Sequence, residues 1–207
     1  MSLNELKQQL DIDGADDDND VDLQRALDAA AAAIDNACGR TFRLSSADET
    51  KLYYPNTAWV LDVIDLVSVT SVKVDTDGDR TYATTLATTD YELLPYNEAR
   101  YQQLRIWPTS SHTFSPGWLA QVVGRFGYVE GADVSDPDPA NWIPGTAPWP
   151  VKQANLLLGA RYYKRREAPF GILSAADIGA FARLAREDPD VASLLQFYSL
   201  NTSWVAV

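Results

Sequence analysis

Seven aspartates stand close together between Asp11 and Asp22, and carboxylates are the ligands that calcium and magnesium prefer. A calcium loop of the EF-hand type that began at Asp16 would need glycine at its sixth position and glutamate at its twelfth. Those positions hold Val21 and Leu27, so the spacing excludes this type of loop. We expect a solvated loop between two helices, with an acidic contact surface as the alternative.

A second acidic segment, DTDGD at residues 75–79, fails the same test because its sixth and twelfth positions would be Arg80 and Leu86. It lies between VTSVKV and RTYATT, which are rich in the residue types that favour strands. An Asp-Gly pair supplies the positive φ angles of a tight turn. The segment therefore predicts a β-hairpin that is closed at Asp77-Gly78.

The groups that could act as nucleophiles or general bases are few. The one histidine, His112, stands beside Ser110 and Ser111, but no nucleophile elbow or glycine-rich oxyanion segment accompanies them. We expect His112 in an exposed loop, and the one cysteine, Cys38, as a small core residue. No glycine-rich phosphate loop is present. The sequence predicts no catalytic residue, no cofactor and no structural metal.

Charge excludes further classes of function. The 207 residues carry 29 acids and 17 bases, a net charge of -12, divided as -8 over residues 1–50, -6 over 51–150 and +2 over 151–207. Such a surface repels phosphate, so sequence-specific binding of nucleic acid is not expected. One cysteine excludes an internal disulfide, and one histidine excludes zinc sites built from several His or Cys ligands, whereas carboxylates could still hold calcium or magnesium.

Two features bear on membranes and secretion. The longest apolar run, Ala29–Ile34, is far shorter than the roughly 18 residues of a membrane span. The opening segment MSLNELKQQLD lacks the apolar core of a signal peptide. We therefore expect neither a membrane span nor a secretion signal.

Helical spacing marks the first 40 residues. Leucines at helical intervals follow Ser2, a good N-cap with Glu5 three residues on, and Gly14 is expected to end this short helix. A second helix is expected over residues 20–38, where Gly39 can close its C-terminus. Its apolar face holds Leu23, Leu27, Ala30, Ile34 and Cys38.

From Thr41 to about Val129 the pattern changes to short stretches rich in Val, Thr, Tyr and Trp, which is typical of strands. Besides the hairpin, strands are expected at Lys51–Tyr54, Tyr91–Leu94, Gln103–Trp107 and Leu119–Tyr128. Residues 130–150 contain five of the eleven prolines, so they predict a long structured loop or strap.

Helical spacing returns near residue 149. A central helix is expected over 149–167, with Val151, Ala154, Leu157, Leu158 and Tyr162 on one face, and Leu156 and Ala160 indicate burial on more than one side. Ser174 and Asp177 resemble a capping box for a further helix. Asp188-Pro189 predicts the start of a last short helix.

The order of elements predicts an α+β fold, in which N- and C-terminal helices form a helical bundle and a large β-rich region is inserted between them. We divide the chain into an N-terminal helical pair (1–40), the β-rich insertion with its proline-rich strap (41–148), the C-terminal helices (149–200) and a tail (201–207). No internal repeat is present.

Two further groups of residues allow a functional interpretation. Lys164, Arg165 and Arg166 crowd the end of the central helix, where cations complement the helix dipole or contact an acidic partner or a DNA backbone. Trp107, Trp118, Trp142 and Trp149 stand near loops. They either pack the core and the strap or offer stacking surfaces for sugars.

The chain resembles the head-tail connector, or adaptor, family of tailed bacteriophages. The resemblance rests on an N-terminal helical pair joined by an acidic loop, the segments VTSVKV, DYELL and GRFGY, and WPVKQANLLLGARYYKRRE, in which a proline precedes an apolar helix that ends in Tyr162, Tyr163, Arg166 and Glu167. It covers roughly residues 3–170, and related proteins occur in phage-derived gene transfer particles. The family's shorter members have a smaller β part than the one expected here.

The resemblance implies a structural virion protein without enzymatic activity. Copies would form a ring of about twelve subunits beneath the portal, join the DNA-filled head to the next neck or tail-completion protein (the stopper), and let DNA pass through the lumen. It implies location in the virion neck after assembly in the cytoplasm of the bacterial host. It also implies that the C-terminal segment docks on the portal.

Expected contact residues follow from the tail and from the charged clusters. Leu200, Trp204, Val205 and Val207 are apolar and would dock on the portal, unless the tail folds back on its own core. Asp16, Asp17, Asp18, Lys164, Arg165 and Arg166 are candidates for contact with the lumen or a neighbouring copy. Two other classes of function stay open, a β-rich module that binds glycans through tryptophans, and a hydrolase that uses two carboxylates.

Overall fold

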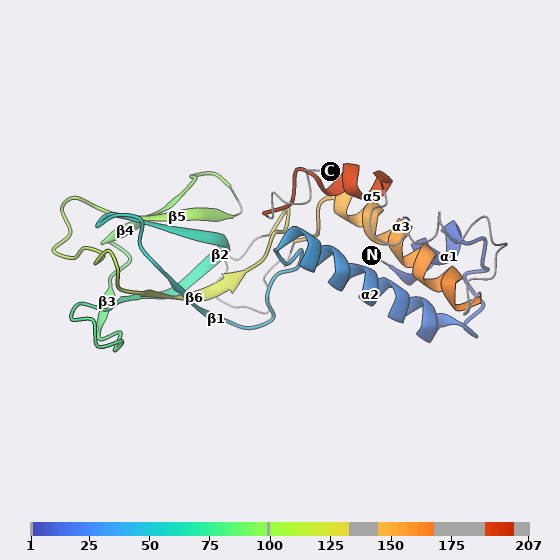
Figure 1. Ribbon diagram of the computed structural model, residues 1–207, viewed down its shortest axis with the longest axis horizontal. Coiled ribbons are helices and arrows are strands. Elements are labelled where there is room, and N and C mark those ends of the chain that lie inside the picture. The colour runs from blue at the N-terminus through green and yellow to red at the C-terminus, as the bar shows by residue number, and fades with distance from the viewer. Residues whose placement is uncertain (1, 99, 133–144, 168–188, 201–207) are drawn as a thin grey trace, which may run out of the picture. The chain divides into compact units, whose positions relative to one another are not determined.

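The computed structural model describes residues 2–98, 100–132, 145–167 and 189–200. The described residues form two compact units, one within Met1–Arg40 and Pro148–Val207 and the other within Thr41–Ala147. Helices make up the first unit and strands the second, as Figure 1 shows, so the expected α+β class is confirmed. The full helical bundle would include residues 168–188, which lie outside the described residues, and it stays a prediction.

The helical unit contains α1 (Leu3–Gln9), α2 (Asp20–Cys38), α3 (Trp149–Glu167) and α5 (Pro189–Leu195). Both halves of the expected capping box are present at α1: the Glu5 N–H donates to the Ser2 hydroxyl, and the Ser2 N–H donates to the Glu5 carboxylate. These bonds lower the pKa of Glu5. None of the four helices combines the length and the apolar character that a membrane crossing requires.

One helix boundary was predicted wrongly. Helix α1 ends at Gln9 rather than near Gly14, because Asp11 takes a left-handed φ of 56° and turns the chain. The N–H of Ile12 then donates back to the carbonyl of Lys7 at 2.9 Å. Helix α2 ends as expected at Gly39, which has a φ of 67°.

The long helices α2 and α3 pack against each other. The expected apolar face of α2 is confirmed, since Leu23, Leu27, Ala30, Ile34 and Cys38 are all buried. The shared core of α1, α2 and α3 contains Leu6, Leu23, Ala26, Leu27, Leu156, Ala160 and Tyr163. Helix α3 buries residues on more than one side, as its interleaved apolar residues predicted. Three residues of its expected apolar face, Leu157, Leu158 and Tyr162, are only half-buried.

A close approach fixes the contact between the two long helices. A Cβ atom at Gly159 of α3 would lie 3.1 Å from the Leu27 side chain of α2. One turn earlier, the buried amide of Asn155 donates to the Leu27 carbonyl at 3.2 Å. The small residue and the amide thus hold α3 against the middle of α2.

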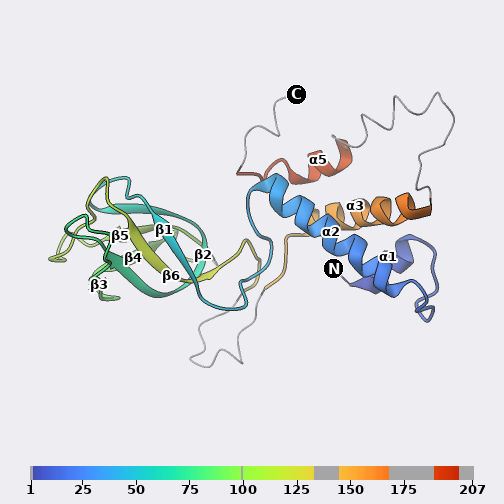
Figure 2. The ribbon, with the colours of Figure 1, turned by 60° about the horizontal axis from the view of Figure 1, so that its bottom comes forward.

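The strand unit is one antiparallel sheet of β1 (Glu49–Tyr53), β2 (Val60–Val74), β3 (Thr84–Leu86), β4 (Tyr91–Leu94), β5 (Tyr101–Ile106) and β6 (Ala120–Phe126). The strand order is β1-β6-β2-β5-β4, and β3 pairs with the end of β2 (Figure 2). All strands expected from the sequence are present within a few residues. Strands β1 and β4 form the two ends of this order.

Strand β2 extends much further than expected. Its first half pairs with β5 and its second half with β6, and the register shifts between Asp62 and Leu66. Asp65 lies in this irregular stretch with a φ of 50°. The hairpin to β3 is confirmed, but the turn is wider than the tight turn expected, because the last pair is Val74 with Thr84 and the loop spans residues 75–83.

Candidate functional site

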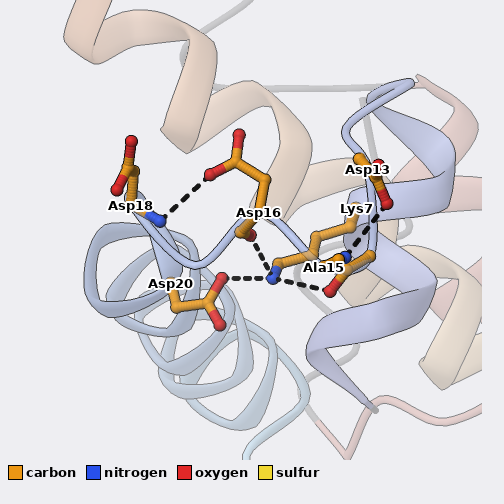
Figure 3. Close-up of polar contacts among 7 residues, drawn as sticks. Lys7, Asp13, Ala15, Asp16, Asp18 and Asp20 are labelled. Atoms are coloured by element: carbon orange, nitrogen blue, oxygen red, sulfur yellow. Dashed lines mark hydrogen bonds and ion pairs between the residues drawn. The ribbon is translucent and has the colours of Figure 1, made fainter.

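The loop between α1 and α2 is organised around a buried lysine that sequence reasoning missed. Only 2% of the Lys7 surface is exposed. Its Nζ lies 2.6 Å from the Asp16 carbonyl oxygen, 2.5 Å from the Asp20 carboxylate and 3.4 Å from the Gly14 carbonyl oxygen (Figure 3). The lysine thus binds both sides of the acidic loop. One feature of the sequence could have indicated this role: Lys7 is the only basic residue before Arg25, and the acidic loop lies between the two.

The carboxylates of Asp13 and Asp16 bind backbone N–H groups of the loop rather than Lys7. The Asp13 carboxylate accepts from the Ala15 N–H at 3.0 Å, and the Asp16 carboxylate accepts from the Asp18 N–H at 3.1 Å (Figure 3). Asp16, Asp17 and Asp18 are exposed. The expected solvated loop between two helices is therefore present, and it has a defined conformation.

The predicted basic cluster lies at the same end of the helical unit. Helices α2 and α3 run antiparallel in Figures 1 and 2, so the C-terminus of α3 lies near the N-terminus of α2. Lys164 and Arg165 are exposed, and the Arg165 guanidinium lies 5.9 Å from the centre of the Tyr162 ring. The side chain of Arg166 is outside the described residues. Acidic and basic groups are thus gathered at one end of this unit.

The DTDGD segment closes the wide turn between β2 and β3. The carboxylate oxygens of Asp75, Asp77 and Asp79 lie within 4.8 Å of one another, a spacing that a metal ion could use. However, the Asp75 carboxylate already accepts from the N–H groups of Asp77, Gly78 and Arg80 at 3.2, 2.7 and 3.0 Å. Burial alone would raise the pKa of Asp75, and these donors outweigh it and lower the pKa.

The serine and histidine near residue 112 do not form a catalytic triad. The Ser110 hydroxyl donates to the Asp90 carboxylate at 3.0 Å, and the backbone N–H of His112, not its ring, donates to the same hydroxyl at 3.1 Å. His112 is half-buried rather than exposed, which corrects the expectation for this loop. The arrangement stabilises the loop, and Ser110 meets the backbone of His112 rather than the imidazole that a triad would use as its base.

Cys38 is a core residue, as predicted. It is 1% exposed at the end of α2, and burial raises the pKa of its thiol to about 11. The thiol therefore stays protonated near neutral pH, where a nucleophilic cysteine would be a thiolate.

A buried carboxylate on β4 was also missed by sequence reasoning. Glu92 pairs with Arg105 of β5 and accepts from the hydroxyl of Tyr96. The nearby pocket beside β4 and β5 has a single carboxylate in its lining, Asp62, whose oxygens accept from the amides of Asn56 at 2.6 Å and of Gln103 at 2.9 Å. This pocket does not offer the pair of carboxylates that the hydrolase alternative requires.

The tryptophans proposed for sugar stacking have different surroundings. Trp107 and Trp118 belong to the strand unit and are 40% and 38% exposed, whereas Trp149 begins α3 and is 66% exposed. A Cβ atom at Gly78 would lie 3.0 Å from the Trp118 ring, so this ring packs on the hairpin turn. Trp142 lies outside the described residues.

The GRFGY segment at the end of β6 is a close-packed junction. A Cβ atom at Gly124 would lie 2.0 Å from the Ser68 carbonyl oxygen of β2. At Gly127, where φ is 155°, a Cβ would lie 2.2 Å from the Arg43 carbonyl oxygen. Glycine is therefore required at both positions, because any side chain would push the neighbouring backbone away.

The polar residues of the same segment hold the chain that leads into β1. Arg125 donates to the Asp48 carboxylate at 3.0 Å and to the Ser45 carbonyl at 2.9 Å. The Arg100 guanidinium lies 3.7 Å from the centre of the Tyr128 ring. Packing within the strand unit thus accounts for the residue types of the GRFGY segment, which carries part of the family resemblance.

Of the predicted docking residues, the structure describes Leu200 alone; Trp204, Val205 and Val207 lie outside the described residues. Leu200 is 41% exposed, and its N–H donates to the Cys38 carbonyl at the end of α2 at 2.8 Å. The chain that leads into the tail is therefore attached to the helical unit.

Comparison with known proteins gives matches among solved structures. No family model matches the chain, and no curated protein matches it. A chain of the virion of a native gene transfer agent (GTA) particle is similar, with a TM-score of 0.56, 17% identity, and 96% of this chain and 89% of that chain covered. A chain in the neck of an empty GTA particle, computed with C6 symmetry, has a TM-score of 0.55, 15% identity and the same coverage.

A third similar chain comes from the neck of a native GTA particle computed with C12 symmetry. Its TM-score is 0.52 at 16% identity, and 94% of this chain and 86% of that chain are covered. At such identities the matches establish a shared fold. The shared fold extends over both the helical unit and the strand unit.

Proposed function

We propose that the chain is a structural virion protein of the neck, a head-to-tail connector that joins a DNA-filled head to the tail. The observation that carries this proposal is the fold shared with GTA particle chains, two of them from the neck, over 94–96% of this chain. A match of that extent includes both units in their order along the sequence. None of the candidate catalytic groups described above has the geometry that an enzyme would need.

In this proposal, about twelve copies form a ring beneath the portal, and the stopper binds on the opposite side. The C12 symmetry of one similar neck supports a ring of that size. DNA passes through the lumen without being read. A net charge of -12 suits this role, because weakly repulsive walls would not retain the DNA. The ring would assemble in the cytoplasm of the bacterial host and remain in the virion.

Charged groups at the end of the helical unit would contact a neighbouring copy or the lumen. The exposed carboxylates of Asp16, Asp17 and Asp18 and the exposed bases Lys164 and Arg165 are opposite in sign, so each group would attract the other on a neighbouring copy. Lys7 would act as a positioning residue for the acidic loop. Arg166 belongs to the same candidate group.

The residues after Leu200 would dock on the portal. Trp204, Val205 and Val207 could insert as a strand into a partner sheet or seat the indole in a pocket. Truncation after Leu200 should leave a cooperatively folded helical unit, measured by circular dichroism, that no longer joins filled heads lacking this protein. If the truncated protein completes infectious particles at the yield of the full chain, the docking role is wrong.

A further inference from the structure

A small apolar pocket lies between the end of α2 and helix α5. Ala37 and Cys38 line it from α2, and Ala192 and Leu195 line it from α5, together with polar residues that include Ser193. Its volume is about 170 Å³, and an apolar cavity of about 150 Å³ is large enough to hold a benzene ring. The pocket therefore has room for one six-membered aromatic ring, such as the benzo ring of an indole, and not for a peptide segment.

The chain passes directly by this pocket on its way to the tail. The Leu200 N–H is bonded to the carbonyl of Cys38, which is itself a pocket residue. Trp204 follows four residues later, so an extended chain of about 3.3–3.6 Å per residue lets its indole reach any point within roughly 13 Å of Leu200. The pocket lies inside that radius.

Exposed apolar side chains lie close in sequence to the pocket residues of the C-terminal turn. Phe197 lies in the turn between two residues of the pocket lining, Gln196 and Ser199, and is 86% exposed. Leu200, three residues further on, is 41% exposed, so this stretch of chain leaves apolar surface beside the pocket lining.

We propose that this α2–α5 pocket holds the indole of Trp204 of the same chain until the tail docks on its partner. The identification of that partner rests on the proposed function, but the seating of the indole does not. The tail of the same chain is favoured over the tail of a second copy. Because Leu200 is hydrogen-bonded to Cys38, the encounter of Trp204 with the pocket is intramolecular and has a high effective concentration. One seated side chain is a weak restraint, so a larger interface can replace it.

Disulfide formation in the isolated chain tests this seating. Cys38→Ala removes the only native thiol, and Ser193→Cys with Ser203→Cys then places one thiol in the pocket lining and one beside Trp204. The matched control carries Trp204→Ala in addition. On mild oxidation of the dilute protein, we expect the intramolecular disulfide to form about tenfold faster with Trp204 than without it. Equal rates, or a cross-linked dimer as the main product, would overturn the proposal.

A second measurement uses the chain with its native thiol. Chymotrypsin cleaves after Trp204, and a seated indole protects that bond. Filling the pocket with Ala192→Phe should increase cleavage there about tenfold, whereas Val21→Phe, an exposed position at the far end of α2, should not change it. Unchanged cleavage in the filled variant would contradict the proposal. Neither assay contains heads or portal. A negative result would therefore reject the seating of Trp204 alone, and the connector function is tested separately by the joining of heads to tails.

Discussion

Lys7→Met should destabilise the helical unit more than any other single change in its charged residues. Methionine keeps the apolar part of the side chain and removes the ammonium group, which is buried and bonds three oxygens. Hydrogen bonds to charged groups contribute about 1.5–3 kcal/mol each. Loss of one partner from a buried ion pair costs about 3–5 kcal/mol.

Two of the Lys7 bonds are short, but the Asp20 side chain is 31% exposed and would be partly solvated after the change. The lower end of these ranges therefore applies, and we expect a loss of about 2–4 kcal/mol. Urea unfolding followed by circular dichroism at 222 nm reports this value for the helices.

A double-mutant cycle isolates the ion pair. Lys7→Met combined with Asp20→Asn should show a coupling of about 1–2 kcal/mol, because each change removes the same contact. Asp22→Asn is the matched control: it lies in the same first turn of α2, and its exposed pair with Arg25 is worth less than about 1 kcal/mol. If Lys7→Met costs no more than this control, or if the coupling is zero, the central role of Lys7 is refuted.

Four further predictions test other parts of the molecule. The pKa of Cys38 is raised from 9.0 to about 11, so at pH 8 its thiol should react with iodoacetamide roughly 100-fold more slowly in the folded than in the unfolded chain. The contribution of the protonated thiol to stability should be complete below pH 9 and should be lost as the pH rises through 11. Gly124→Ala should lower the stability of the strand unit by about 2–3 kcal/mol in urea unfolding, because the new Cβ meets the Ser68 carbonyl. Changing Asp16–Asp18 to Asn should alter stability by less than about 0.5 kcal/mol but change the salt dependence of ring assembly in light scattering; unchanged assembly would favour a plain solvated loop. Replacing residues 41–148 with a short linker should leave the helical circular dichroism largely intact, and loss of cooperative unfolding would count against two separable units.

The elements with local signals were predictable from the sequence. Ser2 with Glu5 and Gly39 carry their own capping chemistry, so one helix start and one helix end follow from neighbouring residues. The regular apolar spacing of α2 and the proline in the first turn of α3, Pro150, likewise depend on positions within a few residues. The order of helices and strands, and with it the α+β class, could therefore be predicted.

Features that depend on distant partners could not be predicted in the same way. The first half of β2 was missed because Asp62 and Asp65 interrupt its apolar pattern, and their amide partners Gln103 and Gln102 come from β5. The burial of Lys7 depends on carbonyl groups whose direction is set only when the loop has folded. The charged clusters could be identified as candidates, but their location at one end depends on the antiparallel packing of α2 and α3.

The most direct test of the connector function is electron cryomicroscopy of the neck of the particle that contains this protein. We predict a ring of about twelve copies between the portal and the stopper, with both units resolved in each copy and DNA density on the ring axis. Particles made without the protein should contain filled heads that lack tails. A neck without density for this chain, or copies found only on the outer surface of the head or tail, would contradict the proposed function.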